Sequence, residues 1–213
     1  MVRRSCTHFW RGTKRIERSW ILATLGVLSL FFLYPAWGEE KPSLGPLIPF
    51  LLLEREGPWE GKMEGENYLL ENSEDPQAVH YVPIPRETIH HSFTITVSGE
   101  TKSPGLCGAG LLYSFKETPL LSYYALIVDN ERGTVSLLRY EEGKFQELFA
   151  MGSERFRSGK HCLTIHEEPQ EVIFSIDNEE IGRLKNDNLS QGMVGIIAIG
   201  IGAFSFSHFV MHP

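Results

Sequence analysis

Short runs in which apolar and polar residues alternate recur about every ten residues from Phe93 to Val210, and they constrain the fold more than any other feature of the chain. The alternation is clearest in residues 93–97 and 172–176, where apolar side chains fall on one face of a strand and polar side chains on the other. Gly, Asn and Asp close most runs, as hairpin turns require. The pattern predicts an all-β, two-sheet antiparallel β-sandwich.

The alternating runs define the predicted strands, and no helical periodicity interrupts them after the N-terminal segment. The strands are expected at residues 68–71, 78–82, 92–98, 110–115, 123–129, 134–140, 145–150, 161–166, 171–176, 180–184, 194–199 and 205–211. Hairpin turns are expected at residues 129–133, 141–143 and 177–179, which are rich in Asn, Asp, Glu and Gly.

The first 38 residues have the layout of a secretory signal peptide. Six basic residues against the single acid Glu17 precede an apolar run at residues 21–34, which is shorter than the ~20 residues that span a bilayer. Ala36 and Gly38 supply the small residues before a cleavage site at Glu39. The sequence therefore predicts export to the periplasm or the extracellular space. An uncleaved membrane anchor is the alternative, and it would also leave the following domain outside.

The remainder of the chain divides into a short linker and one domain. Residues 39–57 are punctuated by Pro and Gly around an apolar patch at residues 47–53, which indicates a linker that ends by docking onto the domain. Residues 58–213 carry the strand pattern and form the predicted jelly-roll domain. Their number falls within the size of a single domain with its own core.

The exported part of the protein is acidic. Residues 1–38 hold six basic residues and one acidic one, so their removal changes the net charge from −7 to −12. Nucleic acids and anionic lipids are polyanions that need Lys and Arg to displace counterions, and an acidic surface disfavours both. We expect a neutral or cationic partner, with membrane contact only through an uncleaved N-terminal segment.

The cysteines leave two interpretations open. Cys6 would be removed with the signal peptide, which leaves Cys107 and Cys162. In an oxidising compartment an isolated pair is a candidate disulfide, whereas Cys is also a common small core residue. The spacing contains no C-x-x-C and no nearby pair of His ligands, so it does not indicate a zinc site.

Several segments together resemble a known family. They are YYALIVD at residues 123–129, VSLLRY at 135–140, FRSGKHCLTI at 156–165 and GMVGI at 192–196, followed by Phe206 and Phe209. They resemble the concanavalin A-like, laminin G-like jelly roll, and most closely the bacterial three-keto-disaccharide hydrolase-like group. The resemblance covers the chain from about Trp59 onward. Lys160 stands where that group usually has an aromatic residue. The resemblance implies the fold, but this fold serves enzymes, lectins and adhesion modules alike.

The motif of a jelly-roll glycosidase is incomplete. Such enzymes use paired carboxylates, one as the acid and the other as nucleophile or base. The nearest approach is residues 175–179, where Ser175 occupies the place of the first carboxylate and Asp177 with Asn178 fits a hairpin turn. If the protein were an enzyme like the resembled group, His161, Asp129 and Asp187 would be the catalytic candidates.

The metal candidates are equally weak. Laminin G-like domains often bind calcium, but Asp129, Asn130 and Asp187 do not form a recognised ligand spacing. The histidines at positions 80, 90 and 91 fit surface residues better than metal ligands, because adjacent residues of a strand face opposite ways. We therefore expect no cofactor, with calcium as the alternative.

Aromatic residues carry the strongest functional pattern. Tyr123, Tyr124, Arg139 and Tyr140 lie on two strands that are expected to be neighbours. Sugar rings stack their apolar faces on aromatic side chains, while Arg and carboxylates bind hydroxyl groups. Ordinary strand packing is the competing interpretation of these tyrosines.

Three functions remain open at this point. The first is an exported, non-catalytic module that binds a carbohydrate or a component of the cell envelope. The second is a glycoside or keto-sugar hydrolase of the jelly-roll type, as the resemblance implies. The third is a structural domain that interacts with a protein through an apolar patch.

Overall fold

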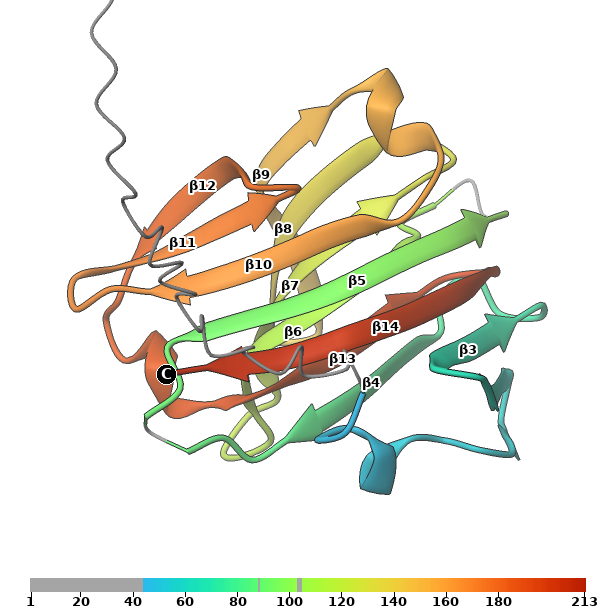
Figure 1. Ribbon diagram of the computed structural model, residues 1–213, viewed down its shortest axis with the longest axis horizontal. Helices are drawn as coiled ribbons and strands as arrows, with labels where there is room; N and C mark the ends of the chain where they lie inside the picture. The colour runs from blue at the N-terminus through green and yellow to red at the C-terminus, as the bar shows by residue number, and fades with distance from the viewer. Residues whose placement is uncertain (1–43, 88, 103–104) are drawn as a thin grey trace, which may run out of the picture. The chain divides into compact units, whose positions relative to one another are not determined.

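The computed structural model describes residues 44–87, 89–102 and 105–213 (Figure 1). The predicted signal peptide, its cleavage site, Cys6 and the start of the linker lie outside these residues. No helix among the residues described is both long and apolar enough to cross a membrane.

Two antiparallel sheets pack against each other, which confirms the predicted β-sandwich (Figure 1). The eight-stranded sheet has the order β1 (Arg55–Glu56), β2 (Trp59–Glu64), β3 (Asn67–Asn72), β14 (Gly202–His212), β5 (Ser92–Thr101), β10 (His161–Glu167), β11 (Glu171–Ile176) and β12 (Glu179–Lys185). The six-stranded sheet has the order β4 (Val79–Ile84), β13 (Met193–Ile199), β6 (Gly108–Lys116), β7 (Ser122–Asp129), β8 (Thr134–Glu141) and β9 (Lys144–Gly152). Three short 3-10 turns complete the described elements: η1 (Ile48–Phe50), η2 (Glu154–Arg157) and η3 (Leu189–Gln191).

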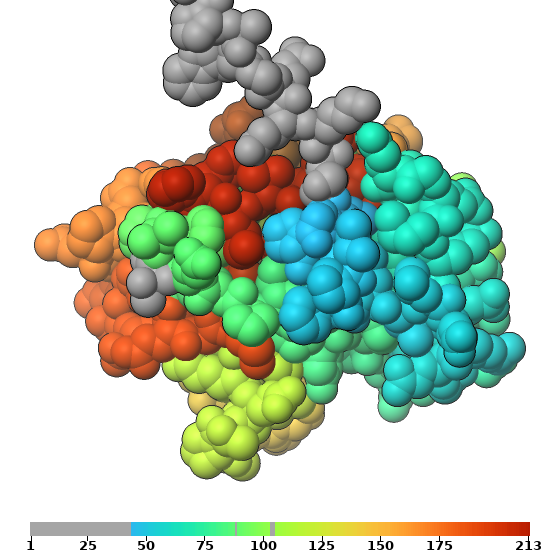
Figure 2. Space-filling model, turned by 60° about the horizontal axis from the view of Figure 1, so that its bottom comes forward, coloured from blue at the N-terminus to red at the C-terminus, as the bar shows by residue number. Residues whose placement is uncertain are grey.

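The core lies between the sheets and follows from the two-residue alternation. On β5, Phe93, Ile95 and Val97 are fully buried, and the residues between them face away from the core. The other strands of both sheets add apolar side chains to the same cluster. Residues 44–53, blue in Figure 2, join this cluster through Leu44 and Leu47, so this segment packs onto the sandwich.

All twelve strands predicted from the alternation are present. The alternation did not predict β1 and β2, because β2 is rich in charged residues. Gly61 at the centre of β2 faces the core, where a Cβ atom would lie 2.1 Å from the carbonyl oxygen of Leu52. The chain passes so closely there that only glycine fits.

The predicted hairpin turn at Asp177 is confirmed. Asp177 and Asn178 join β11 to β12 with φ angles of 50° and 66°. Asn and Asp tolerate this left-handed conformation, which a two-residue hairpin turn of the favoured type demands. The residues that most resembled part of a glycosidase motif therefore form a turn.

The six-stranded sheet has a second apolar cluster on its other face, the one turned away from the eight-stranded sheet. Its buried members are Leu112, Phe115, Tyr123, Ala125, Ile127, Leu138, Ile197 and Ile199. Aromatic rings at its rim contact one another, with Tyr123 stacked on Tyr140 and both rings set against Phe145. This face is mostly apolar, with Ser136 and Glu147 as polar residues towards β9, unlike the outward face of the eight-stranded sheet.

Candidate functional site

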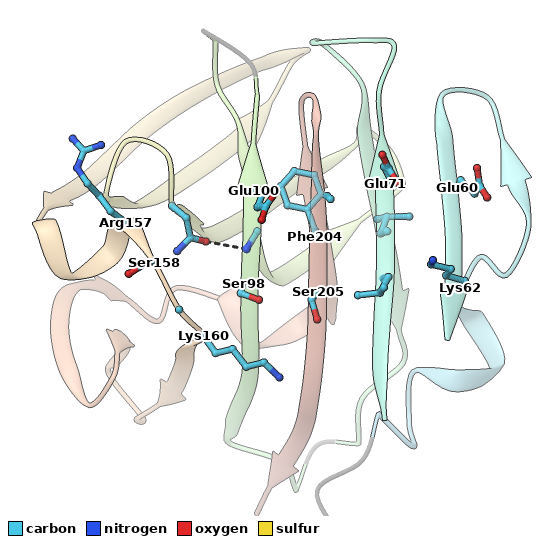
Figure 3. A pocket seen from close by; sticks show the side chains of 16 residues that line it. Glu60, Lys62, Glu71, Ser98, Glu100, Arg157, Ser158, Lys160, Phe204 and Ser205 are labelled. Atoms are coloured by element: carbon cyan, nitrogen blue, oxygen red, sulfur yellow. Dashed lines mark hydrogen bonds between the residues drawn. The ribbon is translucent and has the colours of Figure 1, made fainter. Parts of the chain in front are cut away.

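A cleft of about 640 Å³ lies on the outward face of the eight-stranded sheet, the face turned away from the core (Figure 3). Strands β2, β3, β14 and β5 form its floor, and residues 157–160, from the last residue of η2 to the residue before β10, form one wall. Its charged and hydroxyl side chains are Glu60, Lys62, Glu71, Ser98, Glu100, Arg157, Ser158, Lys160 and Ser205. The volume falls within the range of pockets that bind small molecules.

Strand register sets three glutamates in one row across the floor. Glu60 on β2 lies directly opposite Glu71 on β3. Glu71 in turn lies opposite Ala203 on β14, and Ala203 lies opposite Glu100 on β5. Residues directly opposite on antiparallel strands have Cβ atoms about 5 Å apart, so Glu60 and Glu71 are near neighbours.

A second row, two residues further along each strand, is less acidic. It runs from Lys62 on β2 through Leu69 to Ser205 and Ser98. The Nζ atom of Lys62 lies 2.7 Å from the Oε1 atom of Glu64. This contact raises the pKa of the Lys62 amine, and the negative charges of Glu60 and Glu71 add to the effect. Lys62 therefore remains a hydrogen-bond donor among the acids.

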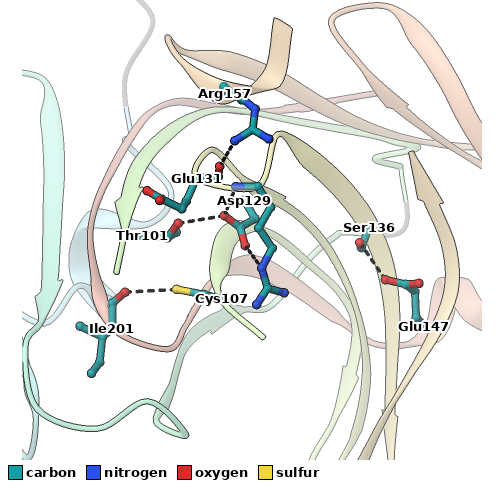
Figure 4. Close-up of polar contacts among 9 residues, drawn as sticks. Thr101, Cys107, Asp129, Glu131, Ser136, Glu147, Arg157 and Ile201 are labelled. Carbon is teal, nitrogen blue, oxygen red and sulfur yellow. Dashed lines mark hydrogen bonds and ion pairs between the residues drawn. The ribbon is translucent and has the colours of Figure 1, made fainter. Parts of the chain in front are cut away.

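The wall of the cleft is tied to the floor by polar contacts. Lys160 reaches back over the sheet, and its Nζ atom donates to Asn67 Oδ1 at 3.4 Å. The buried side chain of Asn130 holds the β7–β8 turn in place, because its Oδ1 accepts from the Gly99 amide at 2.9 Å and its Nδ2 donates to the Phe156 carbonyl at 2.7 Å. The same wall carries Arg157, which donates to the carbonyl of Glu131 (Figure 4).

The tyrosine and arginine residues singled out in the sequence meet elsewhere, at a hollow of about 190 Å³. Tyr123, Tyr124, Arg139 and Tyr140 all line it, together with Asp187. Tyr123 is only 2% exposed, and its ring stacks on that of Tyr140 with centroids 4.8 Å apart. Burial raises the pKa of the Tyr123 hydroxyl.

The two cross-strand pairs of this group lie on opposite faces of the six-stranded sheet. Tyr123 pairs with Tyr140 and joins the outward apolar cluster, whereas Tyr124 pairs with Arg139 and packs against the core between the sheets. The guanidinium of Arg139 forms an ion pair with Glu141. Much of the tyrosine surface is therefore used in packing, and the hollow is smaller than the cleft.

The three catalytic candidates do not converge. Asp187 lines the small hollow, whereas neither His161 nor Asp129 lines the hollow or the cleft. The carboxylate of Asp129 accepts hydrogen bonds from Thr101 Oγ1 at 2.8 Å and from the Arg132 amide at 3.1 Å (Figure 4). These contacts fix the β7–β8 turn.

His161 has an acid partner that the sequence did not reveal. Its Nδ1 atom lies 2.9 Å from Oδ2 of Asp177, and its ring meets Phe156 edge-on with centroids 5.6 Å apart. Asp177 is brought back by the β10–β11 hairpin, and its Oδ1 accepts from the Cys162 amide at 2.8 Å. His161 is 5% exposed and faces the core side of β10. The pair joins the start of β10 to the β11–β12 turn.

The residues considered as calcium ligands do not form a common site. Asp129 and Asn130 bond to other parts of the protein, and Asp187 lies at the small hollow. Among residues 44–87, 89–102 and 105–213, no group of three or more His, Cys, Asp or Glu side chains could hold a metal ion.

The three histidines considered for metal binding differ in their surroundings. His91 is exposed, with its Nδ1 atom 3.7 Å from Oε2 of Glu167, and His90 is half-buried. His80 is half-buried against Trp59, with ring centroids 5.7 Å apart. Burial lowers the pKa of His80, which favours its neutral form.

The candidate disulfide between Cys107 and Cys162 is not present in the described part of the chain. Cys107 lies buried at the start of β6, where its thiol donates to the Ile201 carbonyl at 3.2 Å (Figure 4). Cys162 lies on β10 of the other sheet and faces outward. The residues belong to different sheets and to different faces, so their sulfur atoms do not meet.

Comparison with known proteins supports the fold. No protein-family model matches the sequence, and no curated protein matches it. Among solved structures, a functionally unknown protein from Saccharomyces cerevisiae has a TM-score of 0.51 and 13% identity, over 74% of this chain and 94% of that one. A mutant of the GH43 protein BlXynB from Bacillus licheniformis has a TM-score of 0.51 and 16% identity, over 75% of this chain and 38% of that one.

A xylan β-1,4-xylosidase from Bacillus halodurans gives a similar result, with a TM-score of 0.51 and 12% identity over 73% of this chain and 35% of that one. The similarity thus spans little more than a third of each of the two larger proteins. At these identities the comparisons establish a shared β-sandwich and nothing about the ligand.

Proposed function

We propose that this protein binds a neutral saccharide in the cleft and does not convert it. The observation that carries the proposal is the balanced, hydrogen-bonding lining of the cleft. Three acids, Glu60, Glu71 and Glu100, face three cations, Lys62, Arg157 and Lys160, with serine hydroxyls between them. A ligand with net charge gains little from such a lining. Saccharide hydroxyls, which both donate and accept, fit all of these groups.

Binding without catalysis is favoured by the exposure of the carboxylates. A glycosidase needs one carboxylic acid that holds its proton near neutral pH, which partial burial provides. Glu60, Glu71 and Glu100 are all exposed to solvent. The contacts of Asp129 and Asp177 assign these two acids to turns of the sandwich.

Calorimetric titration with cello-, laminari-, malto- and xylo-oligosaccharides tests the proposal. We expect at least one series to bind, and Glu71→Gln and Lys62→Met each to weaken binding about tenfold, because a hydrogen bond to a charged group is worth roughly 1.5–3 kcal/mol. Lys144→Met, an exposed lysine on β9 of the other sheet, is the matched control and should bind normally. Absence of binding by all four series would overturn the proposal.

The small hollow supplies the competing location for the same ligand. If Arg139→Ala and Tyr140→Ala abolish binding while Glu71→Gln leaves it intact, the saccharide occupies the hollow and not the cleft. The same variants therefore decide between the two locations in one experiment.

Hydrolysis is the second candidate, favoured by the close cross-strand pair Glu60 and Glu71. Release of reducing sugar from the same four series, lost in Glu71→Gln, would establish it. His161→Ala tests the hypothesis that His161 is catalytic. If this variant keeps its stability but loses turnover, while Glu71→Gln retains turnover, the chemistry is assigned to His161.

We also propose that the protein is exported, from the basic leader and the apolar run at residues 21–34. Expression of the full chain in a bacterial host, followed by fractionation and N-terminal sequencing, tests this. A mature protein that begins at Glu39 supports cleavage. An intact chain in the membrane fraction indicates an anchor, and an intact chain in the cytoplasm contradicts export.

A further inference from the structure

The cleft opens onto an uncharged strip that continues along the outward face of the eight-stranded sheet. Before Glu100, which lies on the floor of the cleft, the outward residues of β5 are Ser92, Thr94, Thr96 and Ser98, none of which is charged. Ser98 belongs to the cleft, and the other three extend beyond it. At about 3.3 Å per residue, the distance from Ser98 to Ser92 is about 20 Å.

The neighbouring strands widen this strip with small side chains beside Thr96, and with Val210, His212 and His166 at its far end. Thr96 lies opposite Ser207 on β14 and opposite Cys162 on β10. Thr94 lies opposite Thr164, and their Oγ1 atoms are 3.2 Å apart. We call the set Thr94, Thr96, Ser98, Cys162, Thr164 and Ser205 the hydroxyl strip; all six of its members are half-buried.

The chemistry of the strip selects its partner. Strands β14, β5 and β10 lie inside the sheet, paired on both sides, so their backbone groups are not available to an added protein strand. What remains on the strip is five side-chain hydroxyls and the Cys162 thiol, none of them a charged group that would attract an ionic ligand. A chain of linked, uncharged sugar units presents matching hydroxyls at regular intervals.

We propose that the hydroxyl strip is an extension of the cleft that binds successive units of one extended, neutral polysaccharide. The inference rests on the proposed function, since it requires saccharide binding in the cleft. The cleft binds one end of the bound segment, and the polysaccharide then runs along β5 from Ser98 to Thr94, about 13 Å. The ligand is thus a polymer and not a mono- or disaccharide.

Cys162 provides a built-in reporter at the middle of the strip. Burial raises the pKa of its thiol, so alkylation with iodoacetamide is best measured at alkaline pH. Peptide mapping by mass spectrometry of the full chain separates Cys162 from the other cysteines. Cys107, which is 1% exposed, should stay unmodified throughout and confirms that the sandwich is folded.

The test compares disaccharides with hexasaccharides of the cello, laminari, malto and xylo series. We expect the binding hexasaccharide to slow alkylation of Cys162 at least fivefold and its disaccharide to leave the rate unchanged. We also expect the hexasaccharide to bind at least tenfold more tightly than the disaccharide. If the disaccharide and the hexasaccharide bind with equal affinity and neither protects Cys162, the proposal that the strip binds saccharide is overturned. Saccharide binding in the cleft would still stand.

Two variants on the strip and one control complete the experiment. Thr94→Val removes a hydroxyl at nearly constant shape and should lower hexasaccharide affinity about threefold, with disaccharide affinity unchanged. Thr96→Arg places a bulky side chain across the strip and should abolish the advantage of the longer ligand. Thr134→Val, on β8 of the other sheet, should change neither affinity. If no saccharide of either length binds, the proposed function itself fails and the strip fails with it.

Discussion

The two sheets differ sharply on the faces they turn away from each other. The six-stranded sheet is mostly apolar there, with Leu112 and Ile197 fully buried and a continuous set of aromatic contacts. The eight-stranded sheet carries hydroxyls and balanced charges over the same kind of surface. The difference shows that aromatic residues on adjacent strands do not by themselves mark a ligand site. In this protein Tyr123 and Tyr140 stack on each other, and the polar face holds the larger of the two hollows described above.

The sharpest test of this contrast is a matched pair of truncations, one on each face. Leu112→Ala should lower the free energy of unfolding by about 3 kcal/mol, because it removes buried apolar contacts and leaves a cavity. Thr96→Ala, on the hydroxyl strip, should lower it by less than about 1 kcal/mol. Urea denaturation monitored by tryptophan fluorescence measures both. Similar losses for the two variants would contradict the contrast.

A smaller effect is expected at the rim of the apolar face. Tyr140 is half-buried and stacks on Tyr123, so Tyr140→Ala should lower the free energy of unfolding by roughly 1–2 kcal/mol. The same denaturation experiment applies, with saccharide titration as a second measurement. If Tyr140→Ala left stability unchanged but abolished saccharide binding, the tyrosines would be ligand contacts and not packing residues.

The smallest effect concerns the interior between the two faces, where His80 packs against Trp59. Burial lowers the pKa of His80 below its usual 6.5, so the unfolded state binds a proton more readily than the folded state. This contribution to stability is complete above pH 6.5 and is lost as the pH falls from there towards the folded pKa. His80→Phe should flatten the dependence of stability on pH in that interval, and an unchanged slope would contradict it.

The sequence was sufficient to predict twelve of the fourteen strands described, but not the cleft. The buried and exposed faces of residues 93–97 and 172–176 could be predicted because one side of each strand is fully buried. The cleft depends on which strands are neighbours, and Glu71 meets Ala203 only because β14 returns to pair with β3. Charged residues on β2 and β3 resemble any exposed strand surface until that order is known.

The partner of His161 was missed for a related reason. Asp177 fits a hairpin turn, and it does form the β11–β12 turn, but the pairing of β11 with β10 also brings its carboxylate to the imidazole. A residue that satisfies a local turn can hold a tertiary contact at the same time. Alternation and turn chemistry report only the first role.

Strand β14 sits between β3 and β5, although it follows them by about a hundred residues or more. Until it is in place, β2–β3 and β5–β10 remain separate pieces with unpaired edges, and the floor of the cleft does not exist. Assembly of the eight-stranded sheet is thus postponed until residues 202–212 have been synthesised. A polypeptide that must be threaded unfolded through a translocation channel would benefit from this delay, since premature closure would block its passage.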